Sequence, residues 1–563
     1  MTTLAKQTLF VGGKVITVDA AFSLAQAVLV AGERILAVGT DAEVRALAAP
    51  DAVVVPLNGA TLMPGFVDTH GHLGLFGLDE LKVSLTGATS KADMLARIAE
   101  RVRSAAPGEW IVTMPIGDPP YFLNAPALQA QGQVPLRAEL DAIAPHNPVY
   151  IQAPTNRVPN FAVLNSLALH AAGITATTQV SAQSRVELAA DGTPTGVLSG
   201  ALQPLYNADP LYQLVERVAP ATTYDHIRDG IAALAPQFAA GGTTTLLEAH
   251  LTDPAELRAY AELHAANRLP VRVFYTFEID SRQTLDEIAA YLRTVRFAAD
   301  GGFGTQQLKV IGVSIGLDGP YWHGAAAHGQ AYMGPFGEMV NPDPLVNWEH
   351  YRAILALAAR LDFRIHAEAA GRASIAMALK AFAEIDAQTP IREQRYVIEH
   401  VEFPTLEQIQ LCAQMGVAPT TSTNFIWGKG AEVYQARLGP QLAERAIPMR
   451  DWLDAGVPIA QSTDWGPRSA LFTLWQSLAR HAGLTGQVVG EQQQITRAEA
   501  IRAFTINGAW ALKMETEIGS IVVGKRADLV VLSGDLMACA QDDIKDLQVV
   551  LTMLDGQVVY RAS

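Results

Sequence analysis

The sequence of 563 residues predicts an α/β fold, in which a parallel barrel is joined to a small β-sandwich. Three observations support this prediction. Short apolar runs with glycine turns occupy both ends of the chain, helical patterns alternate with apolar strands between them, and polar side chains follow several of those strands. Because the carboxyl ends of parallel barrel strands meet at one face, we expect functional residues at that face.

The two ends of the chain carry β-type patterns. Runs such as Lys14–Val18 near the start and Ala527–Leu532 near the end are short, apolar and bounded by turn residues. Terminal strands of this kind are expected to pair with one another. The sequence therefore predicts a β-sandwich built from residues 1–60 plus 517–563.

Residues 61–516 are expected to form the barrel, because helical and strand patterns alternate there. The helical patterns lie at Lys91–Ala106, Thr223–Ala240, Pro254–Asn267, Leu285–Arg296, Trp348–Leu361 and Arg497–Ala509. Residues from about 73 to 220 break this rhythm with loop-like segments such as Asp118–Asn124. We interpret them as an insertion after the first barrel strand, of the kind that covers an active site.

Composition narrows the class of protein. The chain carries 41 basic and 56 acidic residues, a net charge of −15, which argues against nucleic-acid and anionic-membrane partners. The first ten residues lack the build of a signal peptide, and no apolar run is long enough to cross a bilayer. We therefore expect a cytoplasmic protein with a small-molecule substrate. The two cysteines, Cys412 and Cys539, imply no disulfide framework.

The most informative segment is Asp68-Thr69-His70-Gly71-His72, which follows an apolar strand pattern. Alternation along a strand sends His70 and His72 to the same side, so both imidazoles can point into the barrel. Three later strand patterns also end in groups that bind metals or transfer protons, namely His366, His400 and Asp464. Together they predict a site for a divalent cation.

These motifs resemble the amidohydrolase superfamily, whose members are metal-dependent hydrolases on a distorted TIM (β/α)8 barrel. The resemblance rests on Pro64–His72, His366, Ile398–His400 and Ser462–Trp465, and it covers nearly the whole chain. Within the superfamily the chain is most similar to the long-insert subgroup that includes N-substituted formamide deformylases. The segments that carry this narrower likeness are Asn165–Leu169, Asp191–Leu198 and Asp454–Pro458.

The resemblance implies one or two divalent ions, with zinc as the expected metal. The implied ligands are His70, His72, Lys309, His366, His400 and Asp464. In many amidohydrolases a lysine that ends the fourth strand reacts with carbon dioxide, and the carbamate bridges two ions; Lys309 resembles it. An ordinary lysine paired with a carboxylate is the alternative. Glu248, on another strand pattern, is the rival bridging residue, and His250 is a candidate supporting group.

The implied chemistry is hydrolysis of an amide-type C–N bond in an N-acyl or N-formyl amine, an amide or a carbamate. A zinc-type cation lowers the pKa of bound water to roughly 7, which supplies hydroxide at neutral pH. Asp464 would accept the proton of that water and pass it to the leaving amine. A second metal, or His400, would polarise the substrate carbonyl and stabilise the oxyanion.

Five residues are candidate substrate contacts. Phe122, Trp322 and Trp465 could line an apolar pocket, and His323 lies in the same expected loop region as Trp322. Asn160 stands where the subgroup usually carries a histidine, so the carbonyl-binding role assumed for that histidine is not transferred to it.

Two other functions stay open. Glu368, two residues after His366, resembles the proton-shuttling glutamate of deaminases and imidazolone hydrolases, so a mononuclear deaminase or cyclic amidine hydrolase is the alternative. A non-catalytic barrel scaffold is the third reading, although such proteins usually lose the metal ligands that this chain keeps. Homo-oligomers are common among the relatives.

Overall fold

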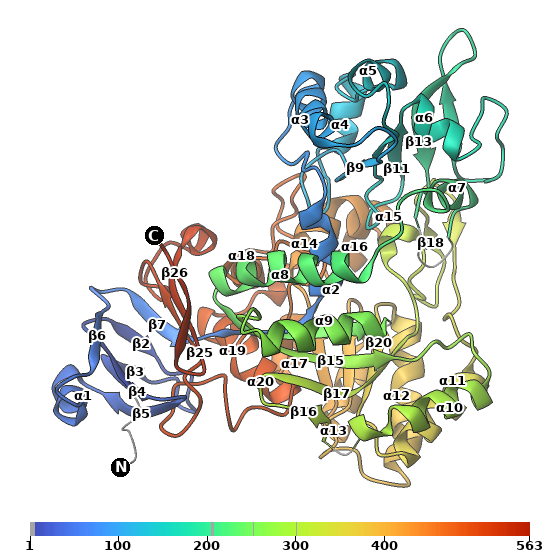
Figure 1. Cartoon of the computed structure of the whole chain (residues 1–563). Helices are drawn as coiled ribbons and strands as arrows, with labels where there is room; N and C mark the ends of the chain where they lie inside the picture. The colour runs from blue at the N-terminus through green and yellow to red at the C-terminus, as the bar shows by residue number, and fades with distance from the viewer. Residues whose placement is uncertain (1–5, 204–207, 252, 300) are drawn as a thin grey trace.

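The computed structural model describes residues 6–203, 208–251, 253–299 and 301–563. Within these residues, eight parallel strands form a nearly closed barrel, which confirms the predicted fold class (Figure 1). In sheet order they are β8 (Phe66–Gly71), β14 (Thr243–Leu251), β15 (Arg272–Glu278), β17 (Leu308–Gly316), β20 (Ile365–Ala369), β21 (Val397–His400), β22 (Ala418–Thr421) and β23 (Ala460–Gln461). Thr69 Oγ1 donates to Gln461 O at 2.8 Å, which links the last strand to the first.

Helices cover the outside of the barrel (Figure 1). They are α8 (Tyr224–Ala240), α9 (Pro254–Ala265), α10 (Leu285–Thr294), α11 (Trp348–Arg360), α12 (Arg372–Asp386), α13 (Leu406–Met415), α17 (Met449–Asp454), α18 (Ala470–Ala479), α19 (Arg497–Ala503) and α20 (Ile506–Ala511). Capping boxes begin several of them, for example at Thr223, Thr284 and Thr405. The single helix expected at Arg497–Ala509 is two helices, because the backbone leaves the helical region at Thr505 (φ −135°, ψ −90°).

Strands from both ends of the chain share one sheet beside the barrel. Its order is β26 (Gln557–Arg561), β25 (Val549–Leu554), β24 (Leu529–Leu532), β7 (Thr61–Pro64), β2 (Lys14–Ile16) and β3 (Leu24–Ala25). A second sheet, β5 (Arg34–Gly39), β4 (Ala27–Ala31), β1 (Gln7–Val11) and β6 (Val53–Pro56), packs on it through a common apolar core. Since β7 pairs with β24, the sandwich extends past the boundary at residue 60 that the sequence suggested.

A buried ion-pair network joins the sandwich to the base of the barrel. Arg272, at the start of β15, is fully buried and donates to Asp528 Oδ2 at 2.9 Å and Asp555 Oδ1 at 3.0 Å. Arg526 also contacts Asp555, at 2.7 Å. Because Asp528 and Asp555 flank strands of the sandwich, this network fixes where the barrel begins relative to the terminal sheets.

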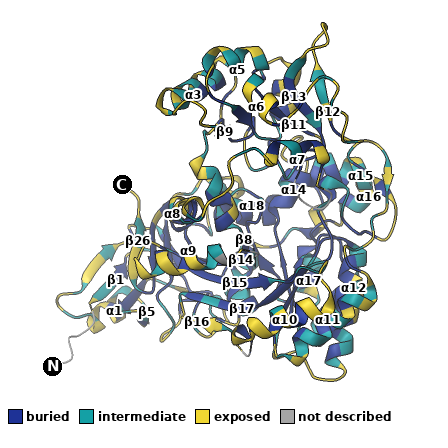
Figure 2. Cartoon of the chain, turned by 45° about the vertical axis from the view of Figure 1, so that its right-hand side comes forward, coloured by how far each residue is buried: buried dark blue, intermediate teal, exposed yellow. Residues whose placement is uncertain are grey.

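Residues between β8 and α8 form a lobe of their own, at the top of Figure 1. Its sheet has the order β12 (Arg185–Leu188), β13 (Pro194–Gly200), β11 (Asn160–Leu164), β10 (Val149–Ile151) and β9 (Ile111–Thr113). Its helices are α3 (Lys91–Ser104), α4 (Ala125–Ala130), α5 (Arg137–Ile143), α6 (Ser166–Ala171) and α7 (Pro210–Glu216). The short helix α2 (Leu73–Gly77), which follows β8, packs against α8 and the barrel core instead (Figure 1). Figure 2 shows that this lobe has buried strands under exposed helices, as the barrel does.

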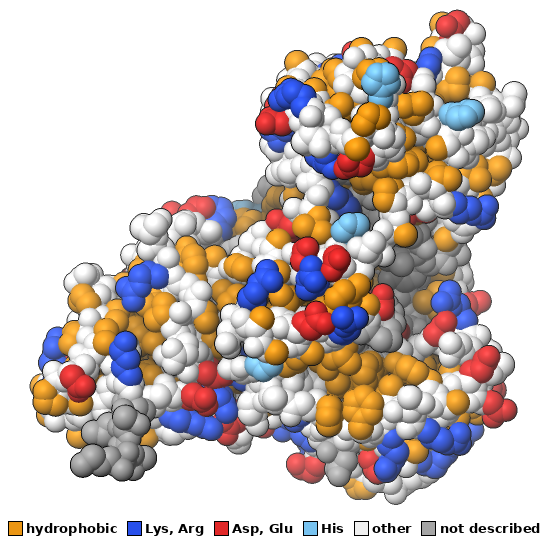
Figure 3. Space-filling view, viewed as in Figure 1, with side chains coloured by type: hydrophobic (Ala, Val, Ile, Leu, Met, Phe, Trp, Pro, Cys, Tyr) orange, Lys and Arg blue, Asp and Glu red, His pale blue; other side chains and the backbone are white. Residues whose placement is uncertain are grey.

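The visible surface carries charges of both signs. On the face shown in Figure 3, Lys and Arg side chains are interspersed with Asp and Glu. Among the helices of the described residues, none has the length and apolarity required to cross a membrane.

The Arg272 network gives a test of the fold. Arg272→Met is expected to lower the free energy of unfolding by about 3–5 kcal/mol, because it leaves the buried carboxylate of Asp528 without its cation. Urea unfolding followed by circular dichroism measures this. The matched control is Arg282→Met, which removes an exposed pair with Asp280 and should cost less than about 1 kcal/mol. Equal effects in the two variants would contradict the structural role.

Candidate active site

A cavity of about 380 Å³ opens at the carboxyl ends of the barrel strands. Side chains from six of these strand ends reach its wall, and most of them are imidazoles or carboxylates. They are His70 on β8 and His72 just after it, His250 on β14, Glu278 on β15, Glu368 on β20, His400 on β21 and Asp464 after β23. The parallel barrel therefore concentrates metal-binding and proton-transferring groups at one face.

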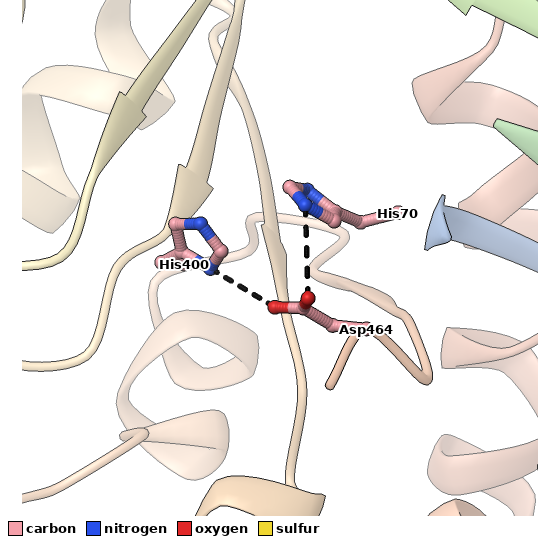
Figure 4. Close-up of side chains that lie close together, drawn as sticks. All are labelled: His70, His400 and Asp464. Carbon is pink, nitrogen blue, oxygen red and sulfur yellow. Dashed lines mark ion pairs between the residues drawn. The ribbon is translucent and has the colours of Figure 1, made fainter. Parts of the chain in front are cut away.

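One group of side chains centres on Asp464. His70, His400 and Asp464 offer ligand atoms that all lie within 4.8 Å of one another, and Figure 4 shows their side chains pointing together. His72 Nε2 lies 3.3 Å from Asp464 Oδ1, and His400 Nδ1 lies 3.4 Å from Asp464 Oδ2. Three imidazoles from two strands thus surround one carboxylate.

A second group centres on Glu399. His70, His250 and Glu399 also place ligand atoms within 4.8 Å of one another. Glu399 Oε2 lies 2.9 Å from His70 Nδ1 and 3.3 Å from His250 Nε2, and its Oε1 lies 3.0 Å from His366 Nδ1. Because His70 belongs to both groups, the two form one continuous cluster.

Several polar atoms of this cluster lack a well-aligned hydrogen bond among the described residues, although some of them lie 2.9–3.4 Å from a group of opposite charge. They are His70 Nδ1, His250 Nε2, His366 Nε2, Glu399 Oε2 and both carboxylate oxygens of Asp464. Buried polar atoms are rarely left this way, since each costs about 1–3 kcal/mol. Imidazole nitrogens and carboxylate oxygens are the donors that zinc, iron, manganese and cobalt bind in proteins. The donor set therefore fits a divalent cation.

The electrostatics keep His366 and Asp464 in forms that suit a metal site. Burial lowers the pKa of His366 to about 4, so its imidazole is neutral at pH 7 and can donate a lone pair. Burial opposes ionisation of Asp464, but the charge of His70 and the hydrogen bond from His72 outweigh it and lower the Asp464 pKa. Asp464 is therefore a carboxylate throughout the physiological range.

Glu368 and His400 form a proton-holding pair at the cavity wall. Burial lowers the pKa of His400, but its hydrogen bond with Glu368, at 3.1 Å, and the charge of Asp464 reverse this and raise the pKa to about 9. Burial raises the pKa of Glu368, and the charge of His250 and the bond to His400 then lower it to about 2. At neutral pH His400 is thus a protonated imidazolium beside an ionised Glu368.

The backbone is strained where it delivers these side chains. His250, His400 and Asp464 have φ values of 61°, 71° and 46°, in the left-handed region that non-glycine residues rarely adopt. Asp68 holds one of these turns: it accepts from Thr463 N at 3.1 Å and from Thr463 Oγ1 at 2.6 Å. The strain and its supports aim the side chains into the cluster.

Comparison with known proteins identifies the chain. A sequence profile of the amidohydrolase family matches residues 53–560. The chain belongs to the amidohydrolase family.

Relatives and solved structures agree with this membership. N-substituted formamide deformylase of Arthrobacter pascens is 29% identical over 573 aligned positions, which cover 99% of each chain. An imidazolonepropionase of Bacteroides fragilis is 42% identical over 86 residues, which cover 15% of this chain and 19% of that protein. The structure of an uncharacterized metal-dependent hydrolase from Pyrococcus horikoshii matches with a TM-score of 0.72 at 18% identity, covering 95% of this chain and 99% of the other.

The predicted family is confirmed, and with it the predicted class of activity. This amidohydrolase is a metal-dependent hydrolase of carbon–nitrogen bonds. The alternative of a non-catalytic barrel is set aside. The structure brings together the five predicted groups His70, His72, His366, His400 and Asp464, and it places Trp322, His323 and Trp465 in the cavity wall.

Lys309 requires a correction, because it lies at the opposite end of the barrel. The residue of β17 that pairs with His366 is Ser314, and Lys309 is five residues earlier, about 16 Å along the strand. Lys309 lines a separate cavity with Arg364 and Lys513. It therefore cannot bridge metal ions in the cluster, and a carbamate on it would serve no such role. The sequence placed a lysine in the correct strand, but it did not show how far along the strand this lysine lies.

Glu248 is not a bridging ligand either. It lies on the second barrel strand and lines the cavity, but its carboxylate turns toward α2, where Oε2 accepts from Leu73 N at 2.7 Å and from Tyr260 Oη. Burial and the nearby Glu256 raise the pKa of Glu248 to about 8. Glu248 is thus a largely protonated group at neutral pH that supports α2.

Two of the predicted substrate contacts are wrong. Asn160 is buried in the lobe, where its side chain bonds the backbone of Pro154 and Leu202 and has no place in the cavity wall. Phe122 packs in the apolar core of the lobe. Its neighbour Tyr121 lines the cavity instead.

The sequence analysis missed two members of the cluster. Glu399 received no role, and His250 was expected only to support a ligand. Adjacent strand residues normally face opposite sides, so Glu399 and His400 should not both face the site. The positive φ of His400 turns its side chain inward beside Glu399. A run of Glu-His at a strand end is the only sequence signal that could have indicated this.

The placement of Lys309 predicts that it is dispensable for metal binding. Lys309→Ala should keep the metal content of the wild type, whereas His366→Ala should lower metal affinity by ~10-fold or more, because it removes a donor from the cluster. Elemental analysis of protein purified without chelator measures both. Loss of metal in Lys309→Ala, restored by a short carboxylic acid, would show instead that Lys309 is a carbamylated bridge.

Proposed function

We propose that this amidohydrolase cleaves N-acyl amines, N-formyl amines among them, by using a divalent cation held in the cluster at the carboxyl end of the barrel. The observation that carries the proposal is the cluster of buried imidazole and carboxylate atoms from His70, His250, His366, Glu399 and Asp464 beside one cavity, which lack well-aligned hydrogen bonds among the described residues. The substrate class is supported by likeness to an N-substituted formamide deformylase over 99% of both chains.

The proposed ligands are His70, His72, His366 and Asp464, with Glu399 and His250 added by the geometry. His400 is a further ligand only in the form that has lost its proton; when protonated it is a hydrogen-bond donor. Zinc is the proposed metal, since neutral imidazole and carboxylate are its usual donors. A cation in this place would polarise the substrate carbonyl and make water more acidic. The two groups around Asp464 and Glu399 share His70, so one or two ions can be accommodated by this donor set.

The protein groups supply proton transfer. Asp464 is ionised, and its oxygens lie 3.3 Å from His72 and 3.4 Å from His400 without a well-aligned hydrogen bond, so it can orient a water and take its proton. His400 carries a proton and faces the same cavity, so it can donate a hydrogen bond to the oxygen of the carbonyl as negative charge develops there. Asp464 then returns its proton to the leaving amine nitrogen.

The cavity wall supports an apolar portion in the substrate. Trp322, Phe425 and Trp465 line it, and Trp465 packs against Phe76 with ring centroids 4.8 Å apart. Aromatic walls of this kind exclude water and bind hydrocarbon groups. An aryl or alkyl substituent on the amide fits these surfaces.

A second candidate is hydrolysis or deamination of a cyclic amidine or imidazolone. The observation that favours it is Glu368, which lies in the cavity wall bonded to His400 and could carry protons to a ring nitrogen. The local likeness to an imidazolonepropionase supports it over 86 residues only. The location in the cytoplasm and a homo-oligomeric state stay predictions. The absence of a nucleic-acid partner is also a prediction, supported by the net charge of −15.

The first prediction concerns substrate and metal. Purified protein should release formate from N-benzylformamide, chelator dialysis should lower kcat/KM by at least ~100-fold, and added zinc should restore it. Release of formate is measured with a coupled dehydrogenase. Turnover of cyclic amidines but not of N-formyl or N-acetyl amines would favour the second candidate.

The second prediction concerns Asp464. Asp464→Asn should lower kcat by roughly 10²–10⁴-fold, because the amide cannot accept a proton from water. KM and metal content should change much less, as measured by steady-state kinetics and elemental analysis. Unchanged kcat with full metal occupancy would contradict the proton-transfer role of Asp464.

A further inference from the structure

Lys429 is a buried cation in the wall of the catalytic cavity, with no role in the chemistry proposed above. It ends α14 (Asn424–Lys429) and is 4% exposed. Its ammonium donates to Glu402 Oε1 at 2.6 Å and lies 3.7 Å from the ring centroid of Phe425, which also lines the cavity. A lysine is rarely buried so deeply unless its hydrogen-bonding capacity is used.

The hydrogen bonds leave Lys429 with donors to spare. An ammonium has three N–H groups, and Glu402 is the one hydrogen-bond partner of Lys429 among the residues that the structure describes. Glu402 itself is 1% exposed, and its second oxygen accepts from Tyr434 Oη at 2.5 Å. Both carboxylate oxygens are therefore occupied. In this part of the cavity wall, Lys429 is therefore the group that can donate a hydrogen bond to a ligand.

The local backbone supports this arrangement. A π-helical turn, Gly430–Gln435, follows Lys429 directly and contains Tyr434, the residue that holds Glu402. π-Helical turns are rare and occur frequently at functional sites. On the other side, the ring of Tyr121 packs against Gly428, where a side chain would collide with it. Tyr121 belongs to the lobe, so the lobe completes the wall next to Lys429.

We propose that Lys429, positioned by Glu402 and Tyr434, is a specificity residue that donates a hydrogen bond to an uncharged oxygen acceptor on the part of the substrate remote from the scissile bond. The acceptor is uncharged because Glu402 already neutralises Lys429, and a substrate carboxylate would face that buried carboxylate. Ether, ketone and amide oxygens have the required chemistry. This inference rests on the proposed function, since it specifies which chemical group the far end of the same amide substrate carries.

The test compares two series of N-formyl amines on the metal-loaded enzyme. One series carries a terminal methoxy group on alkyl chains of graded length, and the other replaces the ether oxygen by methylene. Wild-type kcat/KM should favour the ether by about tenfold or more at the best chain length, because the methylene analogue leaves an N–H group of the buried ammonium without an acceptor. An N-formyl ω-amino acid should be a poorer substrate than the ether.

Three variants assign the preference to Lys429. Lys429→Met with Glu402→Gln removes both charges of the pair and should bring the ether-to-methylene ratio to about one. Tyr434→Phe, which keeps the ring and frees a Glu402 oxygen, should lower the ratio by about threefold. The matched control is Lys380→Met: Lys380 also lies 3.7 Å from an aromatic ring centroid, that of Trp348, but it is exposed on the outer face of α12. It should leave the ratio unchanged.

Binding measurements separate this inference from the proposed function. Dissociation constants of the corresponding product amines, measured on the metal-loaded protein, report the preference for ether over methylene without requiring turnover. If no amide is hydrolysed but the ether amine binds tighter and loses that preference in the double variant, the proposed function fails and the inference stands. A wild-type ratio near one, a ratio unchanged in the double variant, or preference for the carboxylate would overturn the inference.

Discussion

The structure of the site depends on buried polar atoms that lack a well-aligned hydrogen bond within the described part of the chain. Nitrogen and oxygen atoms of His70, His250, His366, Glu399 and Asp464 lie within a few ångströms of one another, away from water. Leaving such atoms unsatisfied is costly, and bringing ionised carboxylates together without a cation is costlier. A bound divalent cation resolves both penalties. The strained backbone at His250, His400 and Asp464 has the same explanation, because it serves to aim these atoms at a common centre.

The sequence predicted the parts of the site that follow from strand alternation and family motifs. His70 and His72 are two residues apart at a strand end, and His366, His400 and Asp464 each end an apolar run, so their convergence could be expected. Lys309 was misplaced because an apolar run shows that a strand exists but not which of its residues reaches the carboxyl end. The register of β17 against β20 decides that, and it sets Ser314 beside His366.

Other errors have equally local causes. Glu399 was overlooked because strict alternation turns it away from the site when His400 faces inward, and only the positive φ of His400 allows both. Phe122 and Tyr121 are adjacent in a turn whose direction the sequence does not determine. In the structure Phe122 is buried in the lobe and Tyr121 lines the cavity. The side chain of Asn160 forms hydrogen bonds with backbone groups of its own lobe. The fold class, in contrast, follows from patterns repeated over hundreds of residues, which no single register error can overturn.

Catalysis and selectivity are divided between the two parts of the structure. The barrel strand ends hold the metal-binding cluster, whereas the lobe and the loops after β17 and β22 supply Tyr121, Trp322 and Lys429 to the rest of the cavity wall. The measurement that tests the central claim most directly is anomalous diffraction at the zinc absorption edge from crystals grown without chelator. The account predicts density among His70, His366, Glu399 and Asp464. Absence of metal there in active protein, or density beside Lys309 at the other end of the barrel, would contradict it.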